Sequence, residues 1–187
     1  TGDAAAAHAG GGGGAAARVV RAVQAVRASY GVFLASAYAQ GAPVPLHVFT
    51  RLGAAAGELG DLDEAVDVYR QGARQCSGAA SAWKGLGLCL LQQGRFTEAE
   101  AALDLSNERD NSDALVWGCV ALCNLQDMLR QGSTGDQYRM AAVGESIKEA
   151  HGLGLDDVGL LFELSACYAK CDRYREATDL LRRAIEL

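Results

Sequence analysis

The sequence has little of what sheets and membrane proteins require. Only two of its 187 residues are proline and 6% are aromatic, whereas alanine, leucine, glutamate and arginine are abundant. This composition favours helix over sheet. The richest apolar stretch, residues 32–39, is interrupted by Ser36 and is too short to cross a bilayer. The sequence therefore predicts an all-α protein without a membrane span.

Acidic residues are missing from residues 4–57, which carry four arginines: Arg18, Arg21, Arg27 and Arg51. Residues 58–187 carry 13 basic and 22 acidic residues, a balance of −9 in a chain whose net charge is −6. An acidic region without a lysine-rich stripe argues against nucleic acid as the partner.

The residues of an enzyme site are also scarce. None of the three histidines has a serine or cysteine partner nearby in the expected fold, and the glycine run 10–14 lacks the Lys-Ser/Thr pair of a phosphate-binding loop. Asp156 and Asp157 open an expected helix, where acids cap the helix and complement its dipole. We therefore expect no catalysis and no cofactor.

One 34-residue pattern occurs twice within residues 46–113. An aromatic residue is followed by Leu-Gly, Gly, Ala and a large apolar residue: Phe49, Leu52, Gly53, Gly60, Ala65 and Tyr69, then Trp83, Leu86, Gly87, Gly94, Ala99 and Leu103. This spacing resembles the tetratricopeptide repeat family, whose unit is a helix-turn-helix. Such units must stack on one another to bury their apolar faces, which implies a curved surface suited to binding.

The period predicts about four repeats, at 46–79, 80–113, 114–157 and 158–187. Trp117 and Leu161 occupy equivalent positions but lie 44 residues apart, so the third repeat holds ten extra residues, which we place near 129–138 between helices at 113–130 and 137–151. The expected fold is a right-handed superhelical array preceded by a helix at 18–41 and an Ala/Gly-rich flexible linker at 1–17. Because Leu187 falls within an expected helix, we expect the chain to be a piece of a longer protein.

The six cysteines allow two interpretations. The pairs Cys119/Cys123 and Cys167/Cys171 have i, i+4 spacing, which could suggest disulfides or zinc. However, Cys89, Cys123 and Cys167 all stand at the tenth position of their repeats, where the family places a small packed residue. Structural zinc motifs more often use Cys-x2-Cys turns, so we favour buried thiols and expect no metal. Reduced thiols would indicate a cytosolic compartment.

The resemblance to the repeat family also predicts a groove lined by the first helix of each pair. The candidate partner-binding residues are Arg51, Lys84, Leu88, Gln92, Cys119, Leu122, Gln126 and Lys170. The middle of this groove is apolar, which suits an amphipathic helix or an apolar peptide segment of a protein partner. The Lys and Asn pattern with which family members grip acidic chaperone tails is missing. Alternatively, Leu88 and Leu122 simply pack against neighbouring repeats.

The helix expected at 18–41 is basic and amphipathic, since Val26, Tyr30 and Phe33 accompany Arg18 and Arg21. It could pack on the array, fill the groove, or bind a membrane surface or a calmodulin-type partner. Packing on the acidic array is the interpretation that we favour.

A narrower resemblance lies within residues 76–125. The residues that carry it are Cys76, Trp83, Gly85-Leu86-Gly87, Thr97-Glu98-Ala99-Glu100, Asn107, Val116-Trp117 and Leu122. They resemble the carboxy-terminal repeats of the cilia- and flagella-associated protein 70 family, an axonemal component. The resemblance implies a scaffold in the assembly or regulation of ciliary motility, with axonemal proteins as partners and a place in the cytoskeleton of a cilium or flagellum. A cytosolic adaptor or an enzyme-tethering subunit unrelated to cilia is the alternative.

Overall fold

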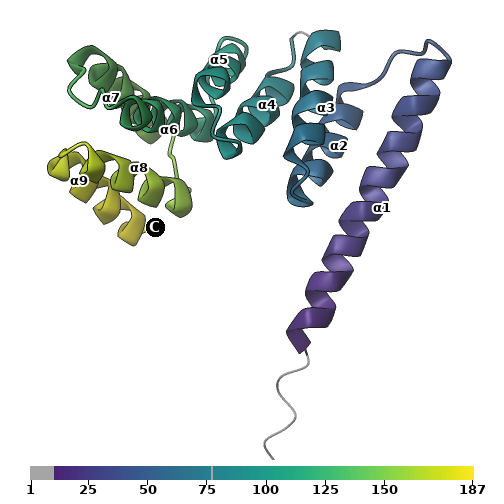
Figure 1. Cartoon of the computed structure of the whole chain (residues 1–187), viewed down its shortest axis with the longest axis horizontal. Coiled ribbons are helices and arrows are strands. Elements are labelled where there is room, and N and C mark those ends of the chain that lie inside the picture. Colours follow the sequence, from purple (N-terminus) through teal and green to yellow (C-terminus); the bar gives the residue numbers. More distant parts are fainter. Residues whose placement is uncertain (1–10, 77) are drawn as a thin grey trace, which may run out of the picture.

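The computed structural model describes residues 11–76 and 78–187, which form helices joined by short turns (Figure 1). The helices are α1 Gly11–Ala39, α2 Leu46–Glu58, α3 Leu62–Gln75, α4 Ala80–Gln92, α5 Phe96–Asn107, α6 Ala114–Gln131, α7 Gln137–Gly152, α8 Val158–Lys170 and α9 Tyr174–Glu186. These described residues contain no strand. Helices α2 to α9 form four successive pairs, so the expected all-α array behind one long helix is confirmed.

Equivalent positions of the first two repeats pack in the same way. A Cβ atom added to Gly53 of α2 would lie 2.7 Å from the Tyr69 ring, and one added to Gly87 of α4 would lie 2.6 Å from Leu103. Ala65 and Ala99, which stand at the same position of the two repeats, are fully buried. The period in the sequence therefore reflects a repeated packing arrangement, in which each small residue makes room for its partner helix.

The turns inside the repeats use the left-handed backbone region. Gly60 and Gly94 have φ values of 80° and 71°, which glycine adopts without steric penalty. The equivalent position of the fourth repeat is Asp172, with φ 58°, and its carboxylate accepts a hydrogen bond of 2.9 Å from the Tyr174 hydroxyl. Aspartate tolerates this region better than most residues, so the turn of the fourth repeat keeps the same backbone conformation without a glycine.

The third repeat contains the extra residues, but mostly as helix. Helices α6 and α7 have 18 and 16 residues, whereas α4 and α5 have 13 and 12. Only residues 132–136 connect them. Only the two ends of the segment 129–138, in which we placed the insertion, are helical, and the connection lies between the helices that we expected at 113–130 and 137–151. The extension keeps the hydrogen bonds of the backbone satisfied within each helix.

The fourth repeat is attached through α6. A Cβ atom at Gly118 would lie 2.7 Å from Leu160 and 3.3 Å from Leu155, so α8 and the turn before it approach α6 closely. Every other pair of consecutive helices in the described residues has closely approaching backbones, but α7 and α8 do not. Arg183 of α9 donates two hydrogen bonds, of 3.1 and 3.3 Å, to the carbonyl oxygen of Leu155. Helix α8 consequently turns toward α6 (Figure 1).

Helix α1 packs on α2 and α3 through its C-terminal half. Leu34 and Ala37 are buried in a cluster with residues of α2, including Phe49. Arg27 donates hydrogen bonds to Asp61 and Glu64 at the start of α3, and Tyr38 and Gln71 are joined by a bond of 3.0 Å. Packing on the array, rather than filling the groove, is thus the arrangement in the structure.

Helix α1 differs in two details from the helix that we expected at 18–41. The helix begins at Gly11, so residues 11–17 are helical where we expected a linker, and residues 1–10 lie outside the described residues. The face that packs carries Arg27, Leu34 and Ala37, whereas Val26 and Phe33 of the expected apolar face are exposed. The apolar residues of α1 are therefore divided between two faces.

All six cysteines are thiols that form no disulfide. Cys89, Cys123 and Cys167 are buried, as their repeat position predicted. Among the described residues, no cluster of His, Cys, Asp and Glu side chains is placed to hold a metal ion. Within the same residues, every helix is too short or too polar to span a bilayer.

Candidate protein-binding groove

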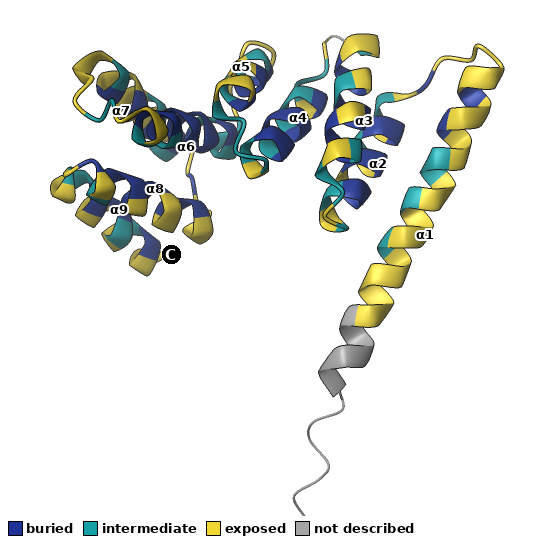
Figure 2. Cartoon of the chain, viewed as in Figure 1, coloured by how far each residue is buried: buried dark blue, intermediate teal, exposed yellow. Residues whose placement is uncertain are grey.

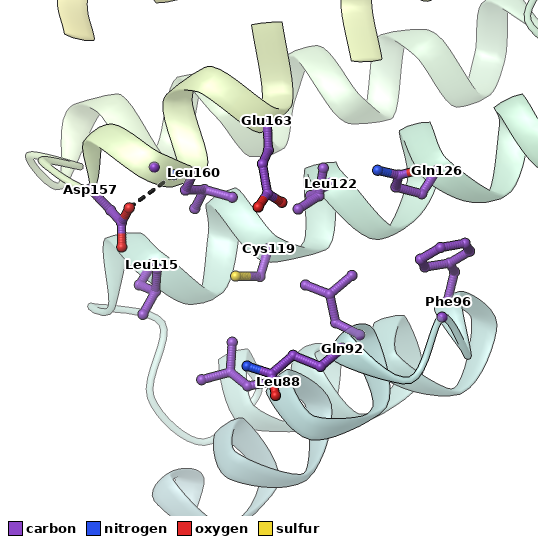
Figure 3. Close-up of a pocket in the computed structure, with 13 residues that line it drawn as sticks. Leu88, Gln92, Phe96, Leu115, Cys119, Leu122, Gln126, Asp157, Leu160 and Glu163 are labelled. Atoms are coloured by element: carbon purple, nitrogen blue, oxygen red, sulfur yellow. Dashed lines mark hydrogen bonds between the residues drawn. The ribbon is translucent and has the colours of Figure 1, made fainter. Parts of the chain in front are cut away.

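A groove with a volume of about 590 Å³ lies between α4, α6 and α8 (Figure 3). The start of α5 and the turn before α8 complete its walls. The residues that line it are Leu88, Leu91, Gln92, Gly94, Phe96, Leu115, Cys119, Leu122, Gln126, Asp157, Gly159, Leu160 and Glu163.

The floor of the groove is apolar because α6 places one face there. Leu115, Cys119, Leu122 and Gln126 follow one another at steps of four, three and four residues, which aligns them along one side of a helix. Cys119 and Leu122 are each 3% exposed, so they form the floor, while Leu88 of α4 is half-buried on the facing wall. Burial raises the pKa of Cys119 to about 12, which keeps its thiol uncharged.

The charged residues of the groove are both acidic. Asp157 caps α8 by accepting a hydrogen bond of 2.9 Å from the backbone N–H of Leu160. Glu163 extends from α8 toward Cys119 and Leu122, and it has no ion pair within the described residues (Figure 3). Among the residues that the structure describes, no lysine or arginine lines the groove. Its chemistry is therefore an apolar floor beside an acidic wall.

Five of the eight residues predicted from the repeat positions line this groove: Leu88, Gln92, Cys119, Leu122 and Gln126. The three basic ones do not. Arg51 lies on α2, which does not border the groove, and Lys170 is exposed at the end of α8. Lys84 donates a hydrogen bond of 2.5 Å to Asp113, so its charge is already paired.

Other lining residues were missed. Leu91 and Leu115 lie three and four residues from predicted positions, so helical spacing alone could have identified them. Phe96 and Asp157 belong to the ends of turns rather than to first helices, and Leu160 reaches the groove because α8 turns toward α6. No signal in the period places these three residues there.

Stacked helix pairs with a common packing period, surrounding an apolar groove, define a helical repeat protein of the tetratricopeptide class. Proteins of this class serve as protein-interaction scaffolds. The family model described as "Cilia and flagella-associated protein 70 C-terminal domain" matches residues 2–187, and the chain belongs to that family.

Solved structures share the fold. A structure entitled "Crystal structure of MamA protein" has a TM-score of 0.67 at 14% identity, over 90% of this chain and 84% of the other. Another MamA crystal structure has a TM-score of 0.66 at 15% identity, over 90% of each chain. MamA from Desulfovibrio magneticus RS-1 has a TM-score of 0.61 at 17% identity, over 86% of this chain and 94% of the other. No curated protein sequence matches the chain.

Proposed function

We propose that this chain is a non-catalytic protein-interaction module of a ciliary or flagellar protein, and that its groove binds an apolar segment of a partner protein. The groove between α4, α6 and α8 is the observation that carries the proposal, because three helices from three repeats line one groove with an apolar floor. A partner side chain such as Leu or Phe gains about 1.5–3 kcal/mol when it leaves water for such a surface.

The electrostatics of the groove support binding rather than catalysis. A nucleophilic cysteine reacts as the thiolate, which requires a lowered pKa. The pKa of Cys119 is instead raised by burial, and the histidine nearest to the fourth repeat, His151, lies outside the lining of the groove. The described part of the groove thus offers a partner apolar contact and two carboxylates, without an activated group.

The ciliary assignment rests on the family to which the chain belongs. Proximity labelling of the full-length protein in ciliated and non-ciliated cells tests it directly. Labelled axonemal neighbours in the ciliated cells support the assignment. The same cytosolic neighbours in both cell types would favour an adaptor unrelated to cilia.

The groove itself is tested by Leu88→Glu. Leu88 is half-buried, so a carboxylate there can reach water while it disrupts the apolar wall, whereas Leu122 is too deeply buried to be substituted without damage to the core. We expect capture of the labelled partners to fall at least tenfold, a change of about 1.4 kcal/mol in binding. Circular dichroism should stay unchanged.

Leu153→Glu is the matched control. Leu153 is exposed in the turn after α7 and does not line the groove, so its substitution should leave capture intact. Equal capture by the wild type and by folded Leu88→Glu would show that partners bind elsewhere.

A further inference from the structure

Residues 17–26 of α1 are mostly exposed, with only Val23 among them half-buried. Val19, Val20 and Val26 are 62, 46 and 41% exposed, and Arg18 and Arg21 are exposed beside them (Figure 2). Val19 and Val26 lie seven residues apart and therefore share one face of the helix. Exposed apolar side chains gathered on one face indicate a surface that another molecule covers.

The charge of this segment complements the groove. Helix α1 contains no acidic residue, so the field around Arg18 and Arg21 is positive. The groove has an apolar floor and two carboxylates, Asp157 and Glu163, and the described part of its lining contains no basic residue. Helical spacing puts Arg18 and Arg21 on the same side of the Val19 and Val26 face, and the two carboxylates lie on one side of the floor, so the two surfaces are complementary.

The groove of the same molecule is out of reach. Helix α1 is held on α2 and α3 by buried Leu34 and Ala37 and by the Arg27 ion pairs with Asp61 and Glu64. Figure 1 places α1 at one end of the array, while the groove lies among α4, α6 and α8 further along it. The exposed half of α1 can meet this groove only in another molecule.

We propose that residues 17–26 of one molecule dock in the groove of a second copy of this chain. Val19 and Val26 would face the floor at Cys119 and Leu122, and the arginines would pair with Glu163 and Asp157. The two surfaces differ, so the contact is head-to-tail, and a pair of molecules keeps one open helix on one molecule and one open groove on the other. This inference rests on the proposed role of the groove in binding protein, and it names an occupant.

Charge reversal on each surface tests the contact in the full chain. Sedimentation equilibrium should show concentration-dependent association of the wild type. The double variant Arg18→Glu/Arg21→Glu and the single variant Glu163→Lys should each raise the dissociation constant at least tenfold, or about 1.4 kcal/mol. The variants Arg175→Glu and Glu149→Lys reverse exposed charges outside both surfaces, so they should associate as the wild type does.

Mixing the two charge-reversed proteins gives the sharper result. The unaltered helix of Glu163→Lys can dock in the unaltered groove of Arg18→Glu/Arg21→Glu, so the mixture should associate although neither protein does so alone. A wild type that stays monomeric at every concentration overturns the inference, as does a mixture that fails to associate. The Leu88→Glu capture experiment remains a separate test, because it reports on other partners of the groove.

Discussion

Tyr69 shows how the repeat works at the scale of single residues. Its ring lies between α2 and α4, where a Cβ atom at Gly53 would be 2.7 Å away and one at Gly85 only 2.2 Å away. Its hydroxyl donates a hydrogen bond of 3.3 Å to the carbonyl oxygen of Thr50, which fixes the ring from the far end. Burial raises the pKa of Tyr69 to about 12. The ring therefore has no room to move away from an added methyl group.

We predict that Gly85→Ala lowers the free energy of unfolding by about 1–3 kcal/mol, because overpacking a well-filled site forces side chains or backbone to shift. Urea unfolding followed by circular dichroism measures the change. Gly144→Ala is the control, since nothing lies within 4 Å of a Cβ atom there and the site is helical. The free energy of unfolding of that variant should rise by about 0.5–1 kcal/mol, because alanine favours the helix more than glycine does. Equal effects of both substitutions would contradict this account of the glycines.

Part of this residue-scale detail could be predicted from the sequence. The tenth repeat position identified Cys89, Cys123 and Cys167 as buried, because packing between paired helices recurs with the period. The basic residues Arg51 and Lys170 were predicted to line the groove from other positions of the repeat, on the first helix of each pair, and they lie outside it. Side chains at the ends of a groove depend on how far the array extends and turns, which a repeat position does not specify.

At the scale of helices, the third repeat is stabilised by a buried carboxylate. Asp127 lies in the C-terminal part of α6 and is almost fully buried. Its Oδ2 accepts hydrogen bonds of 2.9 Å from Arg139 of α7 and 2.6 Å from Gln131. The ends of the two long helices are thus joined across the connection 132–136. The sequence predicted the bounds of these helices well, but it gave no sign of this pair, since a position in an extension has no counterpart in other repeats.

Two arginines that approach the same carboxylate allow a matched experiment. Arg139 is 24% exposed and bonded to Asp127, whereas Arg130 is 62% exposed and 3.9 Å from it. We predict that Arg139→Leu lowers the free energy of unfolding by about 3–5 kcal/mol, because it leaves a buried carboxylate without the cation that is hydrogen-bonded to it. Arg130→Leu should change it by less than about 0.5 kcal/mol, as most exposed substitutions do. Urea unfolding at pH 7 distinguishes the two, and similar losses would show that Asp127 does not depend on Arg139.

At the scale of the whole molecule, the groove depends on where the fourth repeat sits. Gly118 stands where Thr50 and Lys84 stand in the first two repeats, so the period alone does not predict a glycine there. Its missing side chain lets Leu155 and Leu160 lie on α6, and Leu160 then becomes part of the groove wall. The number of repeats follows from the period in the sequence, whereas the position of the last repeat depends on this close approach of Leu155 and Leu160 to α6. The groove would be a different surface without it.

Leu155→Ala tests that dependence. Leu155 is buried against α6 in the turn between α7 and α8. Truncation of its side chain leaves a cavity, which lowers the free energy of unfolding by about 2–5 kcal/mol. Because repeat arrays are stabilised mainly by contacts between neighbours, we expect α8 and α9 to loosen while α4 and α5 keep their protection. Hydrogen exchange measured by mass spectrometry resolves the two regions. Exposed Leu153, two residues earlier, provides the control Leu153→Ala, which should leave both unchanged. Uniform loss of protection along the chain would instead mean that the four repeats unfold as one unit.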